Sequence, residues 1–325
     1  ILSTVISIEI MLRITTFNPP MRMEESNWFG AVPAEGTKLL WGKEGYAITN
    51  YSKFGEIHTP IENSNFDNII ALGDSFTEGW QVPDDQKFTS VTEMILHKSG
   101  YFYNIRNFGK SGQSVADYIS DIQAFNTLYN PKIYIIQISV NDFIESLDKS
   151  RDNHFLVDSG EIINQFPQKE EFSEKFQTSS IIGQITPIII REGLNRLEIT
   201  KENNLADDEL SEPTLITPKL INQQLDLLLQ AANEKTIILI VLPSSPQLCG
   251  DNICFLDSTN KILLETILNR KEFILIDPMN EFKSLVFEGY FPRGFFNSAS
   301  ADDGHLNKHG NQIIGKLLAD SIINV

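Results

Sequence analysis

A serine and a histidine stand near opposite ends of the sequence in positions suited to nucleophilic chemistry. Ser75 follows the apolar run Ile69 to Leu72, and His305 closes the run Asp302-Asp303-Gly304-His305. A serine hydroxyl is a poor nucleophile at neutral pH until a base takes its proton and a third group orients that base. Asp302, three residues before His305, is the predicted orienting acid, with Asp303 as the alternative. These residue types predict a Ser75–His305–Asp302 triad.

Acyl chemistry also needs hydrogen-bond donors for a developing oxyanion. The sequence offers three: the backbone N–H of Ser75, the backbone N–H of Gly112 and the side-chain amide of Asn141. Each follows a different apolar run. In an open parallel sheet, ligands bind outside the carboxyl ends of the strands. We therefore expect the nucleophile, the base, the acid and the oxyanion donors to converge on one edge of a sheet.

The elements that must position these residues alternate along the chain. Short apolar runs rich in β-branched residues predict strands at Ile69 to Leu72, Tyr103 to Asn107, Ile133 to Ser139, Thr236 to Leu242 and Phe273 to Ile276. Helical patterns occur at Phe88 to Lys98, Val115 to Tyr129, Pro218 to Glu234, Thr259 to Leu268 and Leu306 to Ile323. Strands alternating with helices predict a doubly wound α/β domain with a parallel sheet.

Three segments fall outside this alternation. Residues 1–14 are apolar but too short to span a bilayer. They are interpreted as the end of an N-terminal anchor or signal helix, with an amphipathic helix packed on the domain as the alternative. Residues 15–66 are predicted to form an irregular or β-rich preface packed on the domain, which covers 67–325. Residues 143–217 are predicted to be an acidic insertion, partly helical at 179–190. Insertions at the carboxyl ends of strands often form lids and substrate walls.

In these blocks the chain resembles the SGNH (GDSL-type) hydrolases. The matching segments are Gly73-Asp74-Ser75, Asn107 to Gly112, Asn141-Asp142 and Asp302 to His305, in the family's order. The resemblance implies a flavodoxin-like three-layer α/β/α fold with a five-stranded parallel sheet. It implies Ser75 as nucleophile, Asp302 and His305 as its partners, and Gly112 and Asn141 as oxyanion donors. The phrases IIALGDSFTEGWQVPDD, NDF and DGHLNKHG resemble a bacterial, often membrane-anchored branch. One departure is Ser139, where the family usually has glycine.

Several residues have a second interpretation. Ser75 taken alone could be a helix N-cap, and Asn141 could stabilise its own turn. His305 and His309 have the spacing of a metal pair, but the inner glutamate of HExxH is missing. Gly109-Lys110-Ser111 resembles the end of a P-loop, but Asn104 stands at the position of the first glycine. We therefore expect no metal and no cofactor.

Composition limits the partners. The 325 residues carry 26 Lys and Arg against 43 Asp and Glu, a net charge of -17, which disfavours nucleic acid and basic membrane docking. A membrane contact is expected only through the N-terminal anchor. Cys249 and Cys254 lie in a turn-rich stretch and could form a disulfide. Together with the N-terminus they favour an extracytoplasmic location, periplasmic or cell-surface, over the cytoplasm.

The sequence thus favours a serine esterase that cleaves small acyl esters, such as acetyl groups on carbohydrate. Two alternatives remain open: an O-acyltransferase that uses the same triad on a cell-surface glycan, and a non-catalytic binding protein with the same fold. The expected partner is a small-molecule or glycan ester, and the oligomeric state is left open.

Overall fold

A five-stranded parallel sheet forms the centre of the molecule in the computed structural model, which describes residues 23–42, 44–57, 63, 65–165, 216–243, 246–249, 252–255, 260–298 and 304–325. Its strands are β5 (Asp67–Leu72), β6 (Tyr103–Asn107), β7 (Ile133–Ile138), β10 (Thr236–Val241) and β13 (Phe273–Ile276). They lie in the order β13-β10-β7-β5-β6, and every neighbouring pair is parallel. The predicted strands and the predicted strand direction are confirmed.

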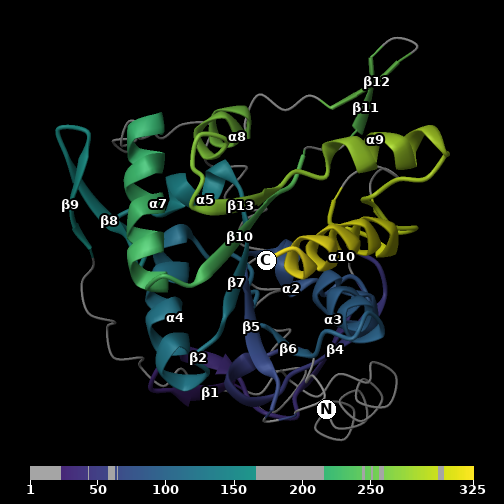
Figure 1. The fold of residues 1–325 in the computed structure, drawn as a ribbon, viewed down its shortest axis with the longest axis horizontal. Helices are drawn as coiled ribbons and strands as arrows, with labels where there is room; N and C mark the ends of the chain where they lie inside the picture. Colours follow the sequence, from purple (N-terminus) through teal and green to yellow (C-terminus); the bar gives the residue numbers. More distant parts are fainter. Residues whose placement is uncertain are drawn as a thin grey trace, which may run out of the picture.

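Helices cover both faces of this sheet (Figure 1). On one face α3 (Phe88–Lys98) packs against α10 (Lys308–Ile323). On the other, α7 (Pro218–Ala232) packs against α4 (Val115–Leu128) and α8 (Lys261–Ile267). The three-layer α/β/α architecture is therefore confirmed. A further helix, α9 (Met279–Phe287), was not predicted; it buries only Phe282 and Val286, which is too short an apolar pattern to signal a helix.

The core explains why the strand sequences lack polar alternation. Ile70 and Leu72 of β5 pack into the cluster under α4 and α7, whereas Ile69 and Ala71 pack into the cluster under α3 and α10. Successive side chains of a strand point to opposite faces, so a strand with two covered faces is expected to be largely apolar. All six residues of β7 are buried for the same reason.

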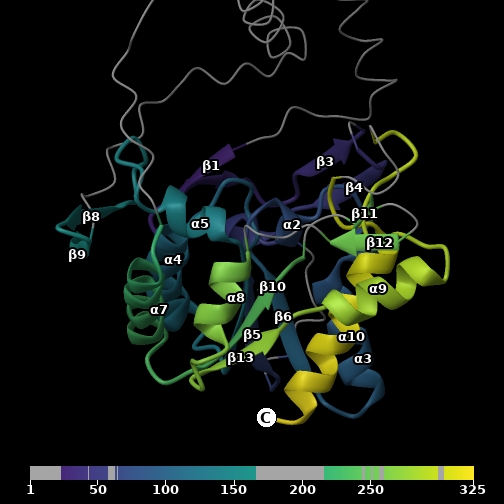
Figure 2. The ribbon, with the colours of Figure 1, turned by 90° about the horizontal axis from the view of Figure 1, so that it is seen from above.

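Two antiparallel hairpins precede the sheet. They pair β1 (Met23–Ser26) with β2 (Gly30–Pro33), and β3 (Lys38–Trp41) with β4 (Ala47–Asn50). A 3-10 turn, η1 (Lys53–Gly55), follows, and Ile57 then pairs with Asn107 at the edge of the main sheet. In Figure 2 these hairpins lie on the same side of the molecule as α2 (Ser75–Glu78) and α5 (Val140–Glu145). The described part of the preface, within residues 23–57, thus contains two β-hairpins that lie beside the carboxyl ends of the strands.

A buried ion pair fastens the preface to the sheet. Arg106 of β6 donates from Nη1 to both carboxylate oxygens of Glu56, at 3.2 and 3.1 Å. Both side chains are almost fully enclosed. Breaking such a pair leaves an uncompensated buried charge, so it fixes how the preface sits on β6.

The remaining described elements are η2 (Asp84–Gln86), the hairpin of β8 (Phe155–Asp158) with β9 (Glu161–Gln165), and the hairpin of β11 (Pro246–Cys249) with β12 (Asn252–Phe255). Residues 166–215, the greater part of the predicted insertion, lie outside the described residues, as does the predicted anchor at 1–14. The side chains of Cys249 and Cys254 also lie outside them, so the disulfide stays a prediction. Within the described part of the chain, no helix is both long and apolar enough to cross a bilayer.

Candidate active site

Ser75 begins the short helix α2 directly after β5. The residue that caps this helix is Asp74, whose carboxylate accepts the Phe76 N–H at 2.8 Å. The N-cap interpretation of Ser75 is therefore wrong, and its hydroxyl is available to another partner. Gly73 makes the turn with φ +151°, and a Cβ at this position would lie 2.2 Å from Thr77 Oγ1. The turn that presents Ser75 consequently requires glycine at position 73.

His305 lies against Ser75, although 230 positions separate the two residues. Its Nε2 is 2.8 Å from Ser75 Oγ, which is hydrogen-bond distance for a nucleophile and its base. The imidazole also packs on the Phe76 ring, with centroids 4.9 Å apart. The backbone of His305 is fixed because its carbonyl accepts the Gly294 N–H at 3.1 Å. The structure thus brings together the predicted nucleophile and the predicted base.

Asp302 and Asp303 lie outside the described residues, so their predicted roles stay predictions. The carboxylate at the other ring nitrogen of His305 belongs to Glu44. Glu44 Oε2 is 2.6 Å from His305 Nδ1, and Glu44 Oε1 accepts the His305 backbone N–H at 2.7 Å. Sequence analysis missed Glu44, because it stands in no recognisable motif and is 261 positions from His305.

The pKa of Glu44 is lowered from its ordinary value of 4.5. Burial alone would raise it, but the side-chain and backbone hydrogen bonds from His305 and the electrostatic effects of the His305 and Arg293 side chains more than offset that effect. Glu44 is therefore an ionised carboxylate at neutral pH. Asp74 differs, since burial raises its pKa above 3.8.

The predicted oxyanion donors come from the strands on either side of β5. Gly112 lies in the loop after β6, with φ +78° and space around its Cα. Asn141 lies in the first turn of α5, directly after β7, and is exposed. Both sit at the carboxyl edge that carries Ser75. Their action on an oxyanion stays a prediction.

The loop after β6 is locked against the nucleophile helix. Asn107 donates from Nδ2 to the Thr77 carbonyl at 2.9 Å and accepts the Gly109 N–H at 2.9 Å. A Cβ on Gly109 would lie 2.5 Å from the backbone nitrogen of Glu78, so the two backbones touch. The buried Glu78 carboxylate accepts both the N–H, at 2.9 Å, and the hydroxyl of Ser111. These contacts hold the loop of residues 107–112 against the helix that begins with Ser75.

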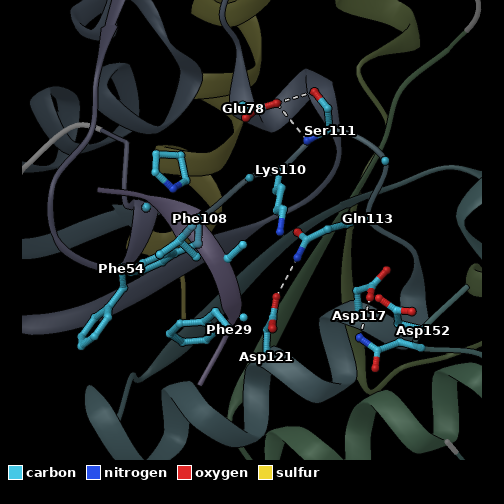
Figure 3. Close-up of a pocket in the computed structure, with 18 of the residues that line it drawn as sticks. Phe29, Phe54, Glu78, Phe108, Lys110, Ser111, Gln113, Asp117, Asp121 and Asp152 are labelled. Atoms are coloured by element: carbon cyan, nitrogen blue, oxygen red, sulfur yellow. Dashed lines mark hydrogen bonds between the residues drawn. The ribbon is translucent and has the colours of Figure 1, made fainter. Parts of the chain in front are cut away.

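A cavity of about 520 Å³ is lined in part by the same loop (Figure 3). Phe29, Phe54 and Phe108 line one side of it. The other side is polar, and there Gln113 Nε2 donates to Asp121 Oδ2 at 2.7 Å. Gly112 is also among the lining residues, so the cavity adjoins a predicted oxyanion donor.

The contacts of His305 and His309 disfavour the interpretation of this pair as metal ligands. Both ring nitrogens of His305 already have partners, Ser75 and Glu44. The His309 ring instead packs on Tyr290 at 5.1 Å. Among the side chains that the structure describes, no three His, Cys, Asp or Glu residues gather as metal ligands would.

The family model for GDSL-like lipases and acylhydrolases matches residues 69–318, which is most of the chain. The chain belongs to this family. Ester hydrolysis is accordingly the reaction class of this acylhydrolase. The match begins at β5, and therefore excludes the hairpin that carries Glu44.

The solved structures that match the chain are distant in sequence. The acylhydrolase is 13% identical to the lipase/acylhydrolase from Enterococcus faecalis, covering 80% of this chain and 96% of that one, with a TM-score of 0.43. It is 13% identical to a lipolytic protein of the G-D-S-L family from Desulfitobacterium hafniense DCB-2, covering 78% and 98%, with a TM-score of 0.41. A two-domain esterase active on acetylated mannans is 11% identical, covering 80% and 50%, with a TM-score of 0.43. None of the curated proteins matches the chain.

The acylhydrolase accommodates its departure at Ser139 without strain. Ser139 has an extended backbone with φ -130°, which any residue adopts, so glycine is not required. Its N–H donates to Asp142 Oδ2 and its hydroxyl to Asp142 Oδ1, each at 3.0 Å. This capping box holds the first turn of α5, which contains Asn141.

Proposed function

We propose that this acylhydrolase is a serine esterase that removes small acyl groups, acetyl above all, from a carbohydrate through an acyl-serine intermediate. The observation that carries the proposal is the 2.8 Å contact between Ser75 Oγ and His305 Nε2 at the carboxyl edge of the sheet. A binding protein with this fold has no need of a base at hydrogen-bond distance from that hydroxyl.

The proposed reaction has two halves. His305 Nε2 takes the Ser75 proton as Oγ attacks the ester carbonyl, and the resulting oxyanion faces the N–H groups of Ser75 and Gly112 and the amide of Asn141. The imidazolium then gives its proton to the leaving alcohol, and the acyl group remains on Oγ. In the second half, His305 deprotonates a water, which attacks the acyl-serine and releases the acid and free Ser75.

The cavity beside Gly112 supports a neutral substrate. Its lining contains five acidic residues (Glu25, Glu78, Asp117, Asp121 and Asp152) and two basic ones (Lys110 and Arg151). This excess of carboxylates repels anionic groups. Aromatic faces opposite amide and carboxylate acceptors suit a ring with apolar faces and hydroxyl edges. We propose that the cavity receives the neutral sugar that carries the ester.

The serine mechanism is tested with Ser75→Ala in the full chain, using p-nitrophenyl acetate and butyrate. We expect kcat to fall by about 10⁴-fold or more, since residues that act as one catalytic unit show losses up to about 10⁶-fold. Ser99→Ala, at an exposed serine after α3, is the matched control and should retain wild-type rates. Equal rates in wild type and Ser75→Ala would refute the mechanism.

The substrate class is tested with O-acetylated glycans that differ in charge. Neutral acetylated mannan or xylan should be deacetylated faster than an acetylated uronic-acid polymer of similar size. Released acetate in water indicates an esterase, whereas acetate appearing on an added acceptor sugar indicates an acyltransferase. A preference for the acidic polymer would contradict the proposed role of the cavity.

A further inference from the structure

We propose that Glu44, supplied by the preface, is the third member of the triad and orients His305 for catalysis. The inference rests on the serine mechanism proposed above and assigns it a residue that lies outside the matched GDSL segment. Glu44 contacts His305 on the ring nitrogen opposite Ser75, and it is therefore proposed as a positioning residue.

The contact has the geometry that an orienting acid requires. A neutral imidazole carries one N–H hydrogen, on either Nδ1 or Nε2. Glu44 Oε2 lies 2.6 Å from His305 Nδ1, so the carboxylate favours the form with the hydrogen on Nδ1. Because Nδ1 carries the proton, Nε2 is left with its lone pair facing Ser75 Oγ, as a general base must be. The second oxygen of Glu44 accepts the His305 backbone N–H at 2.7 Å, so the carboxylate fixes both the ring and its backbone.

The backbone beside His305 is shaped around this carboxylate. Gly304 has φ +94°, and a Cβ there would lie 1.9 Å from Glu44 Oε1 and 2.9 Å from its Cδ. Only glycine leaves room for the acid at this position. Arg293 holds the same backbone by donating from Nη1 to the Gly304 carbonyl at 3.2 Å, and its charge lies near Glu44.

Glu44 itself is held rigidly for a residue in a hairpin turn. Asn297 accepts the Gly45 N–H at 2.7 Å and donates to the carbonyls of Gly42 and Gly45, each at 3.0 Å. A Cβ on Gly45 would lie 2.3 Å from the Gln81 carbonyl oxygen, so the turn is pressed on the segment after α2. The side chain of Glu44 is only 17% exposed. A preorganised carboxylate of this kind orients its partner at little entropic cost.

The assignment differs from the one that the sequence blocks suggest. By resemblance, Asp302 is expected to accept the Nδ1–H, but the described acceptor of that hydrogen is Glu44. The test therefore compares the two acids directly in the full chain, with Glu44→Gln and Asp302→Asn as isosteric variants. Glu35→Gln, at an exposed glutamate in the loop before β3, is the control for charge loss in the preface.

We expect Glu44→Gln to lower kcat for p-nitrophenyl acetate by about 10⁴-fold, the loss typical when a triad histidine is held in the wrong tautomer. KM should change by less than about threefold, because Glu44 does not touch the substrate. Glu44→Asp should recover part of the lost rate. Asp302→Asn should lose at least tenfold less rate than Glu44→Gln, and Glu35→Gln should stay within about threefold of wild type. A loss in Asp302→Asn equal to that in Glu44→Gln overturns the proposal.

A second readout does not depend on turnover. In proton NMR spectra of histidine-labelled protein, the Nδ1–H of His305 should give a low-field signal in wild type and in Asp302→Asn, and no such signal in Glu44→Gln. A signal that survives in Glu44→Gln but vanishes in Asp302→Asn overturns the proposal. If no ester is hydrolysed by wild type, the serine mechanism fails, while these spectra still decide the partner of His305.

Discussion

Replacing Gly304 by alanine should disable the enzyme while leaving it folded. The added Cβ would lie 1.9 Å from Glu44 Oε1, and real contacts of this kind are not shorter than 3.0 Å, so the carboxylate must move by at least 1.1 Å. That shift breaks the 2.6 and 2.7 Å contacts that hold His305. A misplacement of about 1 Å in a catalytic constellation can lower the rate by about 10²-fold, and we expect a loss of that size in kcat.

The effect on stability should be much smaller than the effect on rate. Alanine in the left-handed region costs roughly 1–2 kcal/mol, and the atom that must give way is the far end of a glutamate side chain. Gly289→Ala is the matched control, because Gly289 has φ +87° and open space around it. Urea unfolding should show similar losses for both variants. Only Gly304→Ala should lose activity toward p-nitrophenyl acetate.

A double-mutant cycle with Glu44→Ala tests whether Gly304→Ala lowers the rate by displacing Glu44 or by a separate effect. If Gly304 acts by leaving room for Glu44, the double variant should be no slower than Glu44→Ala alone. The coupling free energy would then be about 2.7 kcal/mol, equivalent to the 10²-fold effect of the single variant. Rates that fall by the product of the two single losses would refute the reasoning.

Two further variants test the frame around the site. Gly109→Ala places a Cβ 2.5 Å from the Glu78 backbone nitrogen, and backbone atoms cannot move aside as a side chain can. This variant should lower the free energy of unfolding in urea by roughly 1–3 kcal/mol and lower kcat/KM about tenfold or more. Wild-type stability and activity would contradict the contact. Burial lowers the pKa of Lys87 from 10.5 to about 8, so the folded state binds fewer protons than the unfolded state between those values and stability rises with pH. Relative to Lys87→Met, wild type should therefore gain about 2 kcal/mol between pH 7 and pH 9.5 in urea titrations, and a flat difference would contradict the burial of its charge.

Much of the fold could be predicted because its signals are local. A strand such as β10, in which Ile237 to Val241 are all buried, appears in the sequence as a continuous apolar run, and the parallel order follows from the helices between such runs. The ends of helices were less certain: α10 begins at Lys308, not Leu306, because Asn307 caps it by accepting the His309 and Gly310 N–H groups. The short α9 has too little apolar surface to be recognised.

The site residues likewise differ in whether their signals are local in the sequence. Ser75 and His305 were predictable because each lies in a short block next to a strand end or a helix start, and the sheet topology brings those ends together. Glu44 was not predictable, because its role depends on how a hairpin docks on residues far along the chain. The turn around Glu44 carries no catalytic signature of its own, and its relevance emerges only from the contacts of Asn297 and Gly304.

The separation of Glu44 and His305 along the chain has a consequence for biosynthesis. A ribosome makes the hairpin with Glu44 early, the nucleophile soon after, and the imidazole 261 residues after Glu44. A nascent or truncated chain that ends before position 305 therefore contains Ser75 and Glu44 but lacks the His305 imidazole that both of them contact. On the proposed mechanism, ester cleavage therefore requires that synthesis has passed His305 and that the helix after it, α10, has packed against α3.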